Sequence, residues 1–537
     1  MTISASNVSP GARPRADAAP ADGHPPPAPP AAPPSTAATL APAAAPRTVW
    51  SSLVVLLLCT AVVTTTLAFG TVHSWSLGLF QLGAALVVVC WALDAWRSGT
   101  LRLSRNALQL PLVGLFAVGL VQLLPLGGEQ AAGGLLAAEG TRALTLDPAA
   151  TRVVLVQLGG LAVFFAAALA YLDSPERLRL VARLVIVFGF LLALYGLMQH
   201  FVNPATIFFL REPKQAAPFG PYVNRHHFAG YMEMTLALPL GLLFAGAVGR
   251  ERALLYAFAA AVMAVALVAT NSRGGIISMA AQIFFLVLVF PAARRREGEG
   301  GGRSSGRGAR LRGAALRLAL GFALVFGVLA GSIYFGGEAS LSRLVGSVNI
   351  EDPTTGRAHF WRGAVEIFKD HPVLGAGLGA FPAAYTRYDT SNGSYRLEQA
   401  HNDYLQLLTD AGLVGGLLGL FFAASLVRRS LARMRSHDRF RRGVALGALT
   451  GCAGVLVHSL FDFTLHSTAN ALLFLVLAAL ATADGRVETP DQHHRRRRRR
   501  SGHGRERVAG AGTLGASRAD APAAVPAPGG DEEPAPV

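Results

Sequence analysis

Charged residues are scarce in this chain. Only 15% of its 537 residues are Asp, Glu, Lys or Arg, whereas about a quarter of the residues in soluble globular proteins are charged. Hydrophobic residues make up 52%, and the mean hydropathy is +0.41. This balance excludes an ordinary soluble domain and indicates an all-α, polytopic membrane protein.

Cysteine is also rare, which excludes a disulfide framework and a CxxC metal site. Its three copies lie inside apolar runs, as small buried side chains do: Cys59, Cys90 and Cys452. No HExxH or comparable ligand spacing is present, so we expect neither a metal nor another cofactor.

The formal net charge of +16 comes from arginines in short clusters between apolar runs and in one run, Arg495–Arg500. Charge placed in this way sets the orientation of membrane helices, so we do not expect a nucleic-acid partner. Arg495–Arg500 could also lie on anionic membrane lipids, each residue contributing about 1 kcal/mol near the surface.

Twelve apolar runs have the length of a membrane span. They are 51–69, 76–96, 107–126, 152–171, 180–201, 227–248, 253–270, 274–292, 314–335, 403–427, 443–461 and 469–485. If the N-terminus is cytoplasmic, every strongly basic loop falls on the cytoplasmic side. The count therefore predicts a bacterial inner-membrane protein with both termini in the cytoplasm.

Composition divides the rest of the chain. Residues 1–46 are rich in Pro, Ala and Ser and predict a disordered cytoplasmic tail, and 486–537 predicts a disordered basic one. No clear cleavage site follows the first apolar run, so we expect a retained helix rather than a signal peptide. A transmembrane domain at 50–485 would then contain one large periplasmic loop, 336–402.

Two segments of this loop have recognisable patterns. Residues 356–368 have helical spacing, with Trp361, Val365 and Phe368 on one apolar stripe, which predicts an amphipathic helix on the outer membrane face. Residues 371–379 are glycine-rich, which predicts sharp turns or close approach to a ligand.

Basic residues on the predicted outer side are few, and they carry the candidate chemistry. Arg273 lies in a tight turn at the bilayer edge, where a guanidinium is costly without an anionic partner. Arg357 begins the predicted amphipathic helix, and a guanidinium at a helix N-terminus suits a phosphate. His401 precedes the span at 403–427 and is a competent proton acceptor from a sugar hydroxyl.

Further polar residues lie on the same predicted side. Asn224, Arg225, His226 and His227 precede the sixth span. His458 and Asp462 share one helix face, which predicts a structural His–Asp pair or, as the alternative, a pair with a secondary role in orienting the site.

These motifs resemble the bacterial O-antigen ligase and polymerase superfamily of multi-pass glycosyltransferases. The resemblance covers about residues 50–485 and is carried by four segments: Asn224–Gly230, Ser272–Gly275, Gly356–Gly377, and His401-Asn402 followed by Gly412–Gly415. It implies transfer of a glycan from undecaprenyl diphosphate to an acceptor hydroxyl, on lipid A core or another glycan, at the periplasmic face and without a metal.

The resemblance also implies roles for residues. Arg273 and Arg357 would hold the diphosphate leaving group, and His401 would activate the acceptor hydroxyl. We expect the remaining candidates to bind or orient the substrate: Arg225, Asn402, His226, His227 and Arg362.

Several alternatives remain open at this stage. A repeat-unit polymerase and a protein O-oligosaccharyltransferase share the motif set, although the latter often bears an extra C-terminal domain. A transporter of lipid-linked glycan would also use about twelve helices, but the polar residues gather at one membrane face. A metal hydrolase built from His226, His227, His401 and Asp403 lacks ligand spacing, and a non-enzymatic receptor gives no reason for Arg273.

Overall fold

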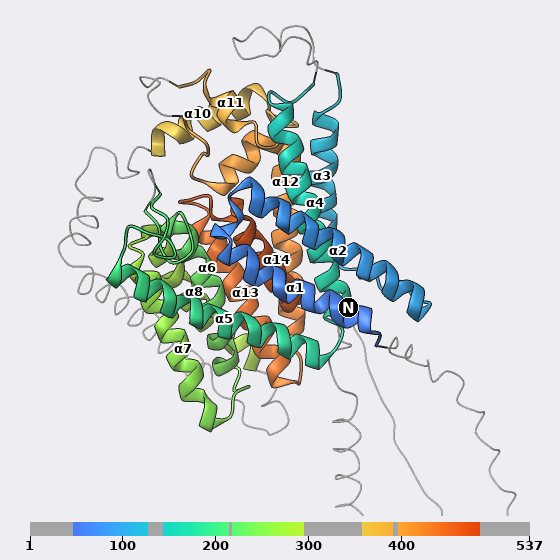
Figure 1. Ribbon diagram of the computed structural model, residues 1–537, viewed down its shortest axis with the longest axis vertical. Helices are drawn as coiled ribbons and strands as arrows, with labels where there is room; N and C mark the ends of the chain where they lie inside the picture. The colour runs from blue at the N-terminus through green and yellow to red at the C-terminus, as the bar shows by residue number, and fades with distance from the viewer. Residues whose placement is uncertain (1–46, 127–142, 214–216, 295–356, 390–395, 484–537) are drawn as a thin grey trace, which may run out of the picture. The chain divides into compact units, whose positions relative to one another are not determined.

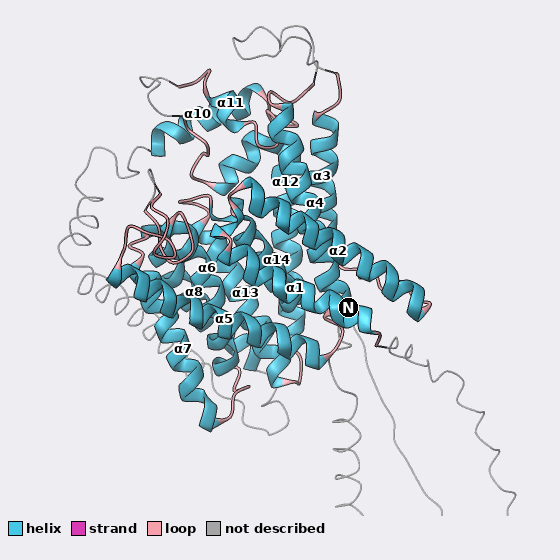
Figure 2. Ribbon diagram, in the orientation of Figure 1, coloured by secondary structure: helices cyan, strands magenta, loops and turns pink. Residues whose placement is uncertain are grey.

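The computed structural model describes residues 47–126, 143–213, 217–294, 357–389 and 396–483. Within these ranges the chain is helical, and it contains two isolated β-bridges but no strand (Figure 2). The predicted span at 314–335, both predicted tails and residues 336–356 of the predicted loop lie outside the described residues.

The long helices follow the predicted apolar runs closely. They are α1 (Val49–Leu67), α2 (Ser74–Ser98), α3 (Gln109–Gln122), α4 (Pro148–Tyr171), α5 (Pro175–Val202), α6 (Arg225–Phe244), α7 (Arg250–Ala269), α8 (Arg273–Arg294), α12 (Asp403–Arg433), α13 (Arg439–His458) and α14 (Thr468–Thr482). The shorter elements are α10 (Arg357–Asp370), α11 (Phe381–Tyr385), and the 3-10 turns η1 (Phe69–Thr71) and η3 (Thr464–His466).

Seven of these helices are long and apolar enough to cross a membrane: α1, α2, α4, α5, α7, α12 and α13. Shorter apolar helices are α3, α14 and the Arg273–Val289 part of α8, and α6 belongs to neither group. The chain is therefore a multi-pass, all-α membrane protein. The count of twelve spans stays a prediction.

Helix α13 packs against α6, α8 and α14, and Figure 1 shows these helices next to one another. Glycines on α13 recur about every four residues and allow the backbones of α6 and α13 to touch. A Cβ at Gly447 would lie 2.6 Å from the carbonyl oxygen of Ala237, and one at Gly241 would lie 2.3 Å from the nitrogen of Gly447. This contact fixes the start of α6 beside the end of α13.

The glycine-rich segment 372–379, which we call the strap, packs on a break in α12. Gly412 has φ 62° and ψ −158°, which interrupts the helix. Strap backbone fills the break: Leu413 N–H donates to Pro372 O at 2.8 Å, and Ala376 N–H donates to Thr409 O at 2.7 Å. Of the strap glycines, Gly375 makes its close approach to α12, whereas Gly377 approaches Thr145 and Gly379 approaches Val154.

Helix α10 forms where predicted, but it buries a different face. Gly363, Ala364 and Ile367 are buried against α11 and the chain before α12, whereas Val365 is exposed. The stripe of Trp361, Val365 and Phe368 is therefore not the face that packs on the protein, and its placement on the outer membrane face stays a prediction. The packed face consists of small residues because Gly363 contacts the ring of Tyr385. A Cβ at this position would lie 2.5 Å from Cε2 of that ring.

Some arginines that lie between the apolar runs form ion pairs with acidic residues near the ends of helices. Arg102 contacts Asp94 at 3.1 Å and Asp173 at 2.7 Å, and Arg177 contacts Asp173 at 3.0 Å. Asp94 is fully buried and accepts a hydrogen bond from Tyr171 Oη at 2.8 Å. These pairs connect α2, α4 and α5.

Candidate functional site

A polar cavity of about 260 Å³ brings together most of the candidate residues. It is lined by Arg225, His226, Asn271, Arg273, Gly274, Arg357 and Asp462. They come from the start of α6, the α7–α8 turn, the start of α10 and the segment after α13. Three guanidinium groups face one carboxylate, so the cavity has excess positive charge and suits an anion.

Each of the three cavity arginines is the first residue of a helix. Arg225 begins α6, Arg273 begins α8 and Arg357 begins α10. The N–H groups of a first helical turn have no intrahelical partner, and the helix dipole adds about half a positive charge there. The helix N-termini and the guanidinium groups therefore both contribute positive electrostatic potential to one small cavity.

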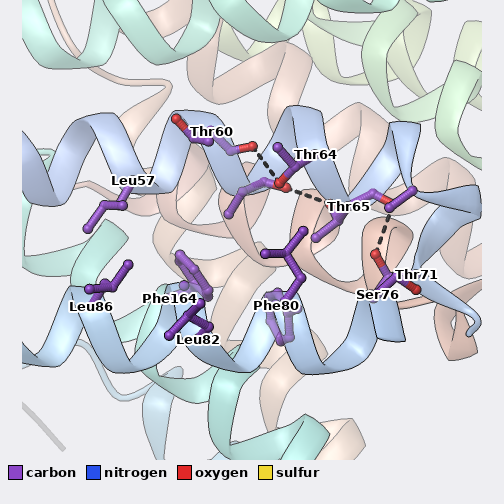
Figure 3. A pocket seen from close by; sticks show the side chains of 14 residues that line it. Leu57, Thr60, Thr64, Thr65, Thr71, Ser76, Phe80, Leu82, Leu86 and Phe164 are labelled. Atoms are coloured by element: carbon purple, nitrogen blue, oxygen red, sulfur yellow. Dashed lines mark hydrogen bonds between the residues drawn. The ribbon is translucent and has the colours of Figure 1, made fainter. Parts of the chain in front are cut away.

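Two other cavities are mainly apolar. One, of about 170 Å³, lies between α1 and α2 and includes Thr64, Thr65 and Ser76 among its lining residues (Figure 3). These hydroxyls donate to backbone carbonyls of their own segments at 2.7–2.9 Å, so the cavity presents mostly carbon. The other, of about 500 Å³, lies among α2, α3 and α4 and has one charged lining residue, Arg152. Neither combines the acidic, basic and imidazole groups of the polar cavity.

Arg273 stands out because no described residue pairs with its guanidinium, although the side chain is half-buried. It follows a tight turn in which Asn271 has φ 53°, a left-handed conformation that asparagine tolerates better than most residues. Ser272 then caps α8, because Gly275 N–H donates to Ser272 Oγ at 3.2 Å. The turn therefore places in the cavity wall a positive charge that no described residue neutralises.

Arg357 is tied to the segment after α13. Its Nη2 lies 3.4 Å from Asp462 Oδ2, and its Nη1 donates to the carbonyl oxygen of Phe461. These contacts leave its remaining N–H groups for a ligand, since guanidinium has five donors.

Asp462 is the centre of the site and is only 2% exposed. Besides Arg357, His401 Nδ1 lies 3.5 Å from its Oδ1, and His226 Nδ1 lies 3.8 Å from its Oδ2. Burial alone would raise the pKa of the Asp462 carboxyl, but the contact with His401 and the charge of Arg357 hold its pKa well below its usual range. Asp462 is therefore a carboxylate at neutral pH.

His401 is held at the edge of the cavity in a strained conformation, with φ 52°. Its ring lies between Phe360, at 6.0 Å between centroids, and Phe463, at 4.8 Å. The side chain is 29% exposed, so one edge of the ring is accessible while Nδ1 faces Asp462. This is the geometry required of a base whose proton is stabilised by a carboxylate.

Both polar atoms of the Asn402 side-chain amide form hydrogen bonds within the protein. Its Oδ1 accepts from Tyr404 N and Leu405 N at 3.0 and 3.1 Å and so caps α12, while its Nδ2 donates to Leu460 O at 3.0 Å. Asn402 therefore connects the start of α12 to the segment that carries Asp462.

The other candidate residues divide between the cavity, the core and the surface. Arg225 and His226 line the cavity. His227 is 6% exposed and lies edge-on to Phe463, at 5.0 Å between ring centroids. Arg362 is exposed on α10 and does not line the cavity.

The predicted side-chain pair of His458 and Asp462 is wrong. His458 Nδ1 instead lies 3.3 Å from Glu233 Oε2, and both side chains are fully buried. The chain leaves the helix after His458, so Asp462 turns towards Arg357. The prediction assumed that the helix continues through Asp462, whereas it ends at His458.

Two further residues were missed by the sequence reasoning. Glu233 is an acidic residue inside an apolar run, which is by itself a signal of function in a membrane protein. Ser272 lies in one of the motif segments but was assigned no role, and only the fold shows that its Oγ lies 2.8 Å from His226 Nδ1.

Within the described ranges, no three or more His, Cys, Asp and Glu side chains are grouped as a metal ion requires. The positive charge of the cavity comes from guanidinium groups and helix N-termini.

Comparison with known proteins gives one family. No curated protein matches the chain. Residues 258–420 match the model of the O-antigen ligase family, a range that contains Arg273, Arg357 and His401 but neither His226 nor Asp462. Residues 258–420 are therefore similar to an O-antigen ligase domain, and this match supports membership of the O-antigen ligase superfamily.

Proposed function

We propose that the protein is a glycosyltransferase of surface polysaccharide biosynthesis that transfers a glycan from undecaprenyl diphosphate to an acceptor hydroxyl. The observation that supports this most is the convergence of Arg225, Arg273 and Arg357, each at a helix N-terminus, on one cavity. A lipid diphosphate needs such charge most when it departs.

The proposed reaction is a single displacement. His401 accepts the proton of the acceptor hydroxyl while that oxygen forms a bond to the anomeric carbon of the glycan. The bond from this carbon to the diphosphate oxygen breaks, and its electron pair stays on the diphosphate. Inversion at the anomeric carbon is the expected stereochemical outcome.

Side chains at the cavity divide these tasks. Arg273, unmatched by any described residue, and Arg225 bind the diphosphate, and His226 contributes a further contact. Arg357 binds it as well while holding Asp462 in place. Asp462 stabilises the imidazolium that forms on His401, whose Nδ1 lies 3.5 Å away.

Placement in the cell belongs to the same proposal. The cavity would open at the periplasmic face of the inner membrane, with both termini cytoplasmic. The isoprenoid tail of the donor would remain in the bilayer while its diphosphate enters the cavity. Lipid A core is the first candidate acceptor.

The test is an assay of purified protein with undecaprenyl diphosphate-linked glycan, with and without a lipid A-core acceptor, followed by mass analysis. Acceptor-dependent transfer is the expected result. Growth of the lipid-linked chain without that acceptor would identify a repeat-unit polymerase instead. Absence of any new glycosidic bond with either substrate, from intact protein and matched glycan, would overturn the proposal.

A further inference from the structure

A chain of polar side chains extends from the polar cavity into the buried interior of α6 and α13. Glu233 Oε2 lies 3.3 Å from His458 Nδ1, and His458 Nε2 lies 3.5 Å from Ser272 Oγ. Ser272 Oγ lies 2.8 Å from Nδ1 of His226, which lines the cavity. Three of the four side chains are fully buried, and His226 is at the cavity wall.

We infer that the Glu233–His458 pair is a positioning device that makes Nε2 of His226 a hydrogen-bond donor towards the anion in the cavity. The inference rests on the proposed function, because it assigns His226 to the diphosphate. Glu233 and His458 themselves touch no substrate in this scheme.

The first step is the charge of the buried pair. An uncompensated charge among packed helices is costly, so the pair is favoured in forms that are neutral in sum. Either Glu233 is ionised and His458 is an imidazolium, or Glu233 is protonated and donates to Nδ1 of a neutral His458. In both forms Nε2 of His458 carries a hydrogen and can donate to Ser272.

The second step is the capacity of Ser272. Its hydroxyl has one hydrogen to donate and two positions to accept. His458 Nε2–H and Gly275 N–H, the latter at 3.2 Å, fill the accepting positions. The hydroxyl hydrogen of Ser272 is then left for Nδ1 of His226.

The third step is the tautomer of His226. A neutral imidazole that accepts at Nδ1 carries its hydrogen on Nε2. Asp462 opposes this tautomer, since its Oδ2 lies 3.8 Å from the same Nδ1 and would attract a hydrogen there. However, the contact with Ser272 is 1.0 Å shorter, and Asp462 also has Arg357 and His401 as partners.

The direct test is nitrogen NMR of purified protein labelled on histidine, with the His226 signals assigned by their loss in His226→Gln. The expected spectrum shows hydrogen on Nε2 of His226. In Ser272→Ala, or in the double variant Glu233→Leu/His458→Phe, the Nδ1–H form that faces Asp462 should increase. An unchanged tautomer in both variants, or Nδ1–H already predominant in the unmodified protein, would overturn the inference.

A binding test follows the same chain of contacts. Affinity for inorganic pyrophosphate should fall about tenfold in Ser272→Ala, as loss of one hydrogen bond to a charged group predicts. In His226→Gln, whose amide supplies its own donor, adding Ser272→Ala should cause little further loss. A full tenfold loss in that background would mean that Ser272 acts through another group.

Matched controls separate positioning from folding. Ser174→Ala removes the side-chain cap of α5, and Thr235→Val alters a buried hydroxyl two residues from Glu233; neither should move the tautomer or the affinity. Both readouts are independent of glycan transfer. If the tautomer shifts as expected in a protein that makes no glycosidic bond, the proposed function fails and the positioning role stands.

Discussion

Arg357 Nη2 lies 3.4 Å from Asp462 Oδ2, although the two residues are 105 positions apart in the chain. This contact joins α10 to the segment after α13 and brings the proposed phosphate-binding cation to the carboxylate that faces His401. The proposed leaving-group site and the proposed base therefore share one residue, Asp462.

Loss of the Asp462 carboxylate should stop catalysis more than it weakens binding. In Asp462→Asn, the imidazolium of His401 loses its counter-charge, and we expect kcat for glycan transfer to fall about hundredfold or more. Initial rates at several donor concentrations measure this. Asp438→Asn at the cap of α13 is the matched control, because asparagine caps equally well. A rate near that of the control would contradict the role of Asp462 as the counter-charge of His401.

Because His401 has a strained backbone, substitutions at this position should affect stability and activity differently. With φ 52°, Ala should be less stable than Gly by about 1 kcal/mol, because only Gly adopts this conformation without cost. His401→Gly and His401→Ala should both lack transfer, while His401→Gly melts at the higher temperature. Equal melting temperatures would show that the left-handed conformation is not maintained in solution.

Two arginines of the cavity should respond differently to neutralisation. Arg273 has no partner among the described residues, so Arg273→Gln should weaken pyrophosphate binding about tenfold and leave thermal stability almost unchanged. Arg357→Gln should weaken binding and also destabilise the protein by about 3 kcal/mol, because it leaves Asp462 buried without its cation. Isothermal titration and thermal melting measure the two effects. Arg387→Gln, which changes an exposed arginine, is the control.

The strap should depend on the break in α12. A Cβ at Gly412 would lie 2.4 Å from the carbonyl of Val373, and its φ of 62° with ψ −158° is accessible only to glycine. Gly412→Ala should therefore cost about 3 kcal/mol or more. Gly78→Ala on α2 is the control: no atom lies within 4 Å of the added Cβ, and Ala should stabilise the helix slightly. Similar melting temperatures for both variants would contradict the packing described.

The ion pair of His466 and Asp403, which lies beside the site, predicts how the stability of the protein depends on pH. His466 Nδ1 lies 2.8 Å from Asp403 Oδ1. Burial lowers the pKa of His466, but the hydrogen bond and charge of Asp403 outweigh it, so the pKa is raised. A raised pKa stabilises the fold below the unfolded value of about 6.5 and loses that contribution as pH rises through the folded value.

Melting temperatures of the unmodified protein and of His466→Gln, measured from about pH 6 to pH 9, check this sign. The advantage of the unmodified protein should be largest at the acidic end and should shrink as the pH rises. An advantage that grows with pH would contradict the pairing.

The sequence by itself determined the class of protein and identified most of the charged residues that line the polar cavity. Long apolar runs specify helices because a chain in lipid must satisfy its backbone internally, and α1, α2, α4 and α5 lie within a few residues of prediction. Arg225, Arg273, Arg357 and His401 were recognisable because the predicted outer side is poor in arginine, so that charge there needs a reason.

Only the tertiary structure decided which of these residues meet. Asp462 was expected to pair with His458 by spacing along one helix, but the helix ends at His458 and the chain turns towards Arg357. Arg362 and His227 looked as suitable as their neighbours, yet one is exposed on α10 and the other is buried behind Phe463. Contacts between distant segments depend on how helices pack, and helix packing here depends on glycines such as Gly447 that carry no chemistry of their own.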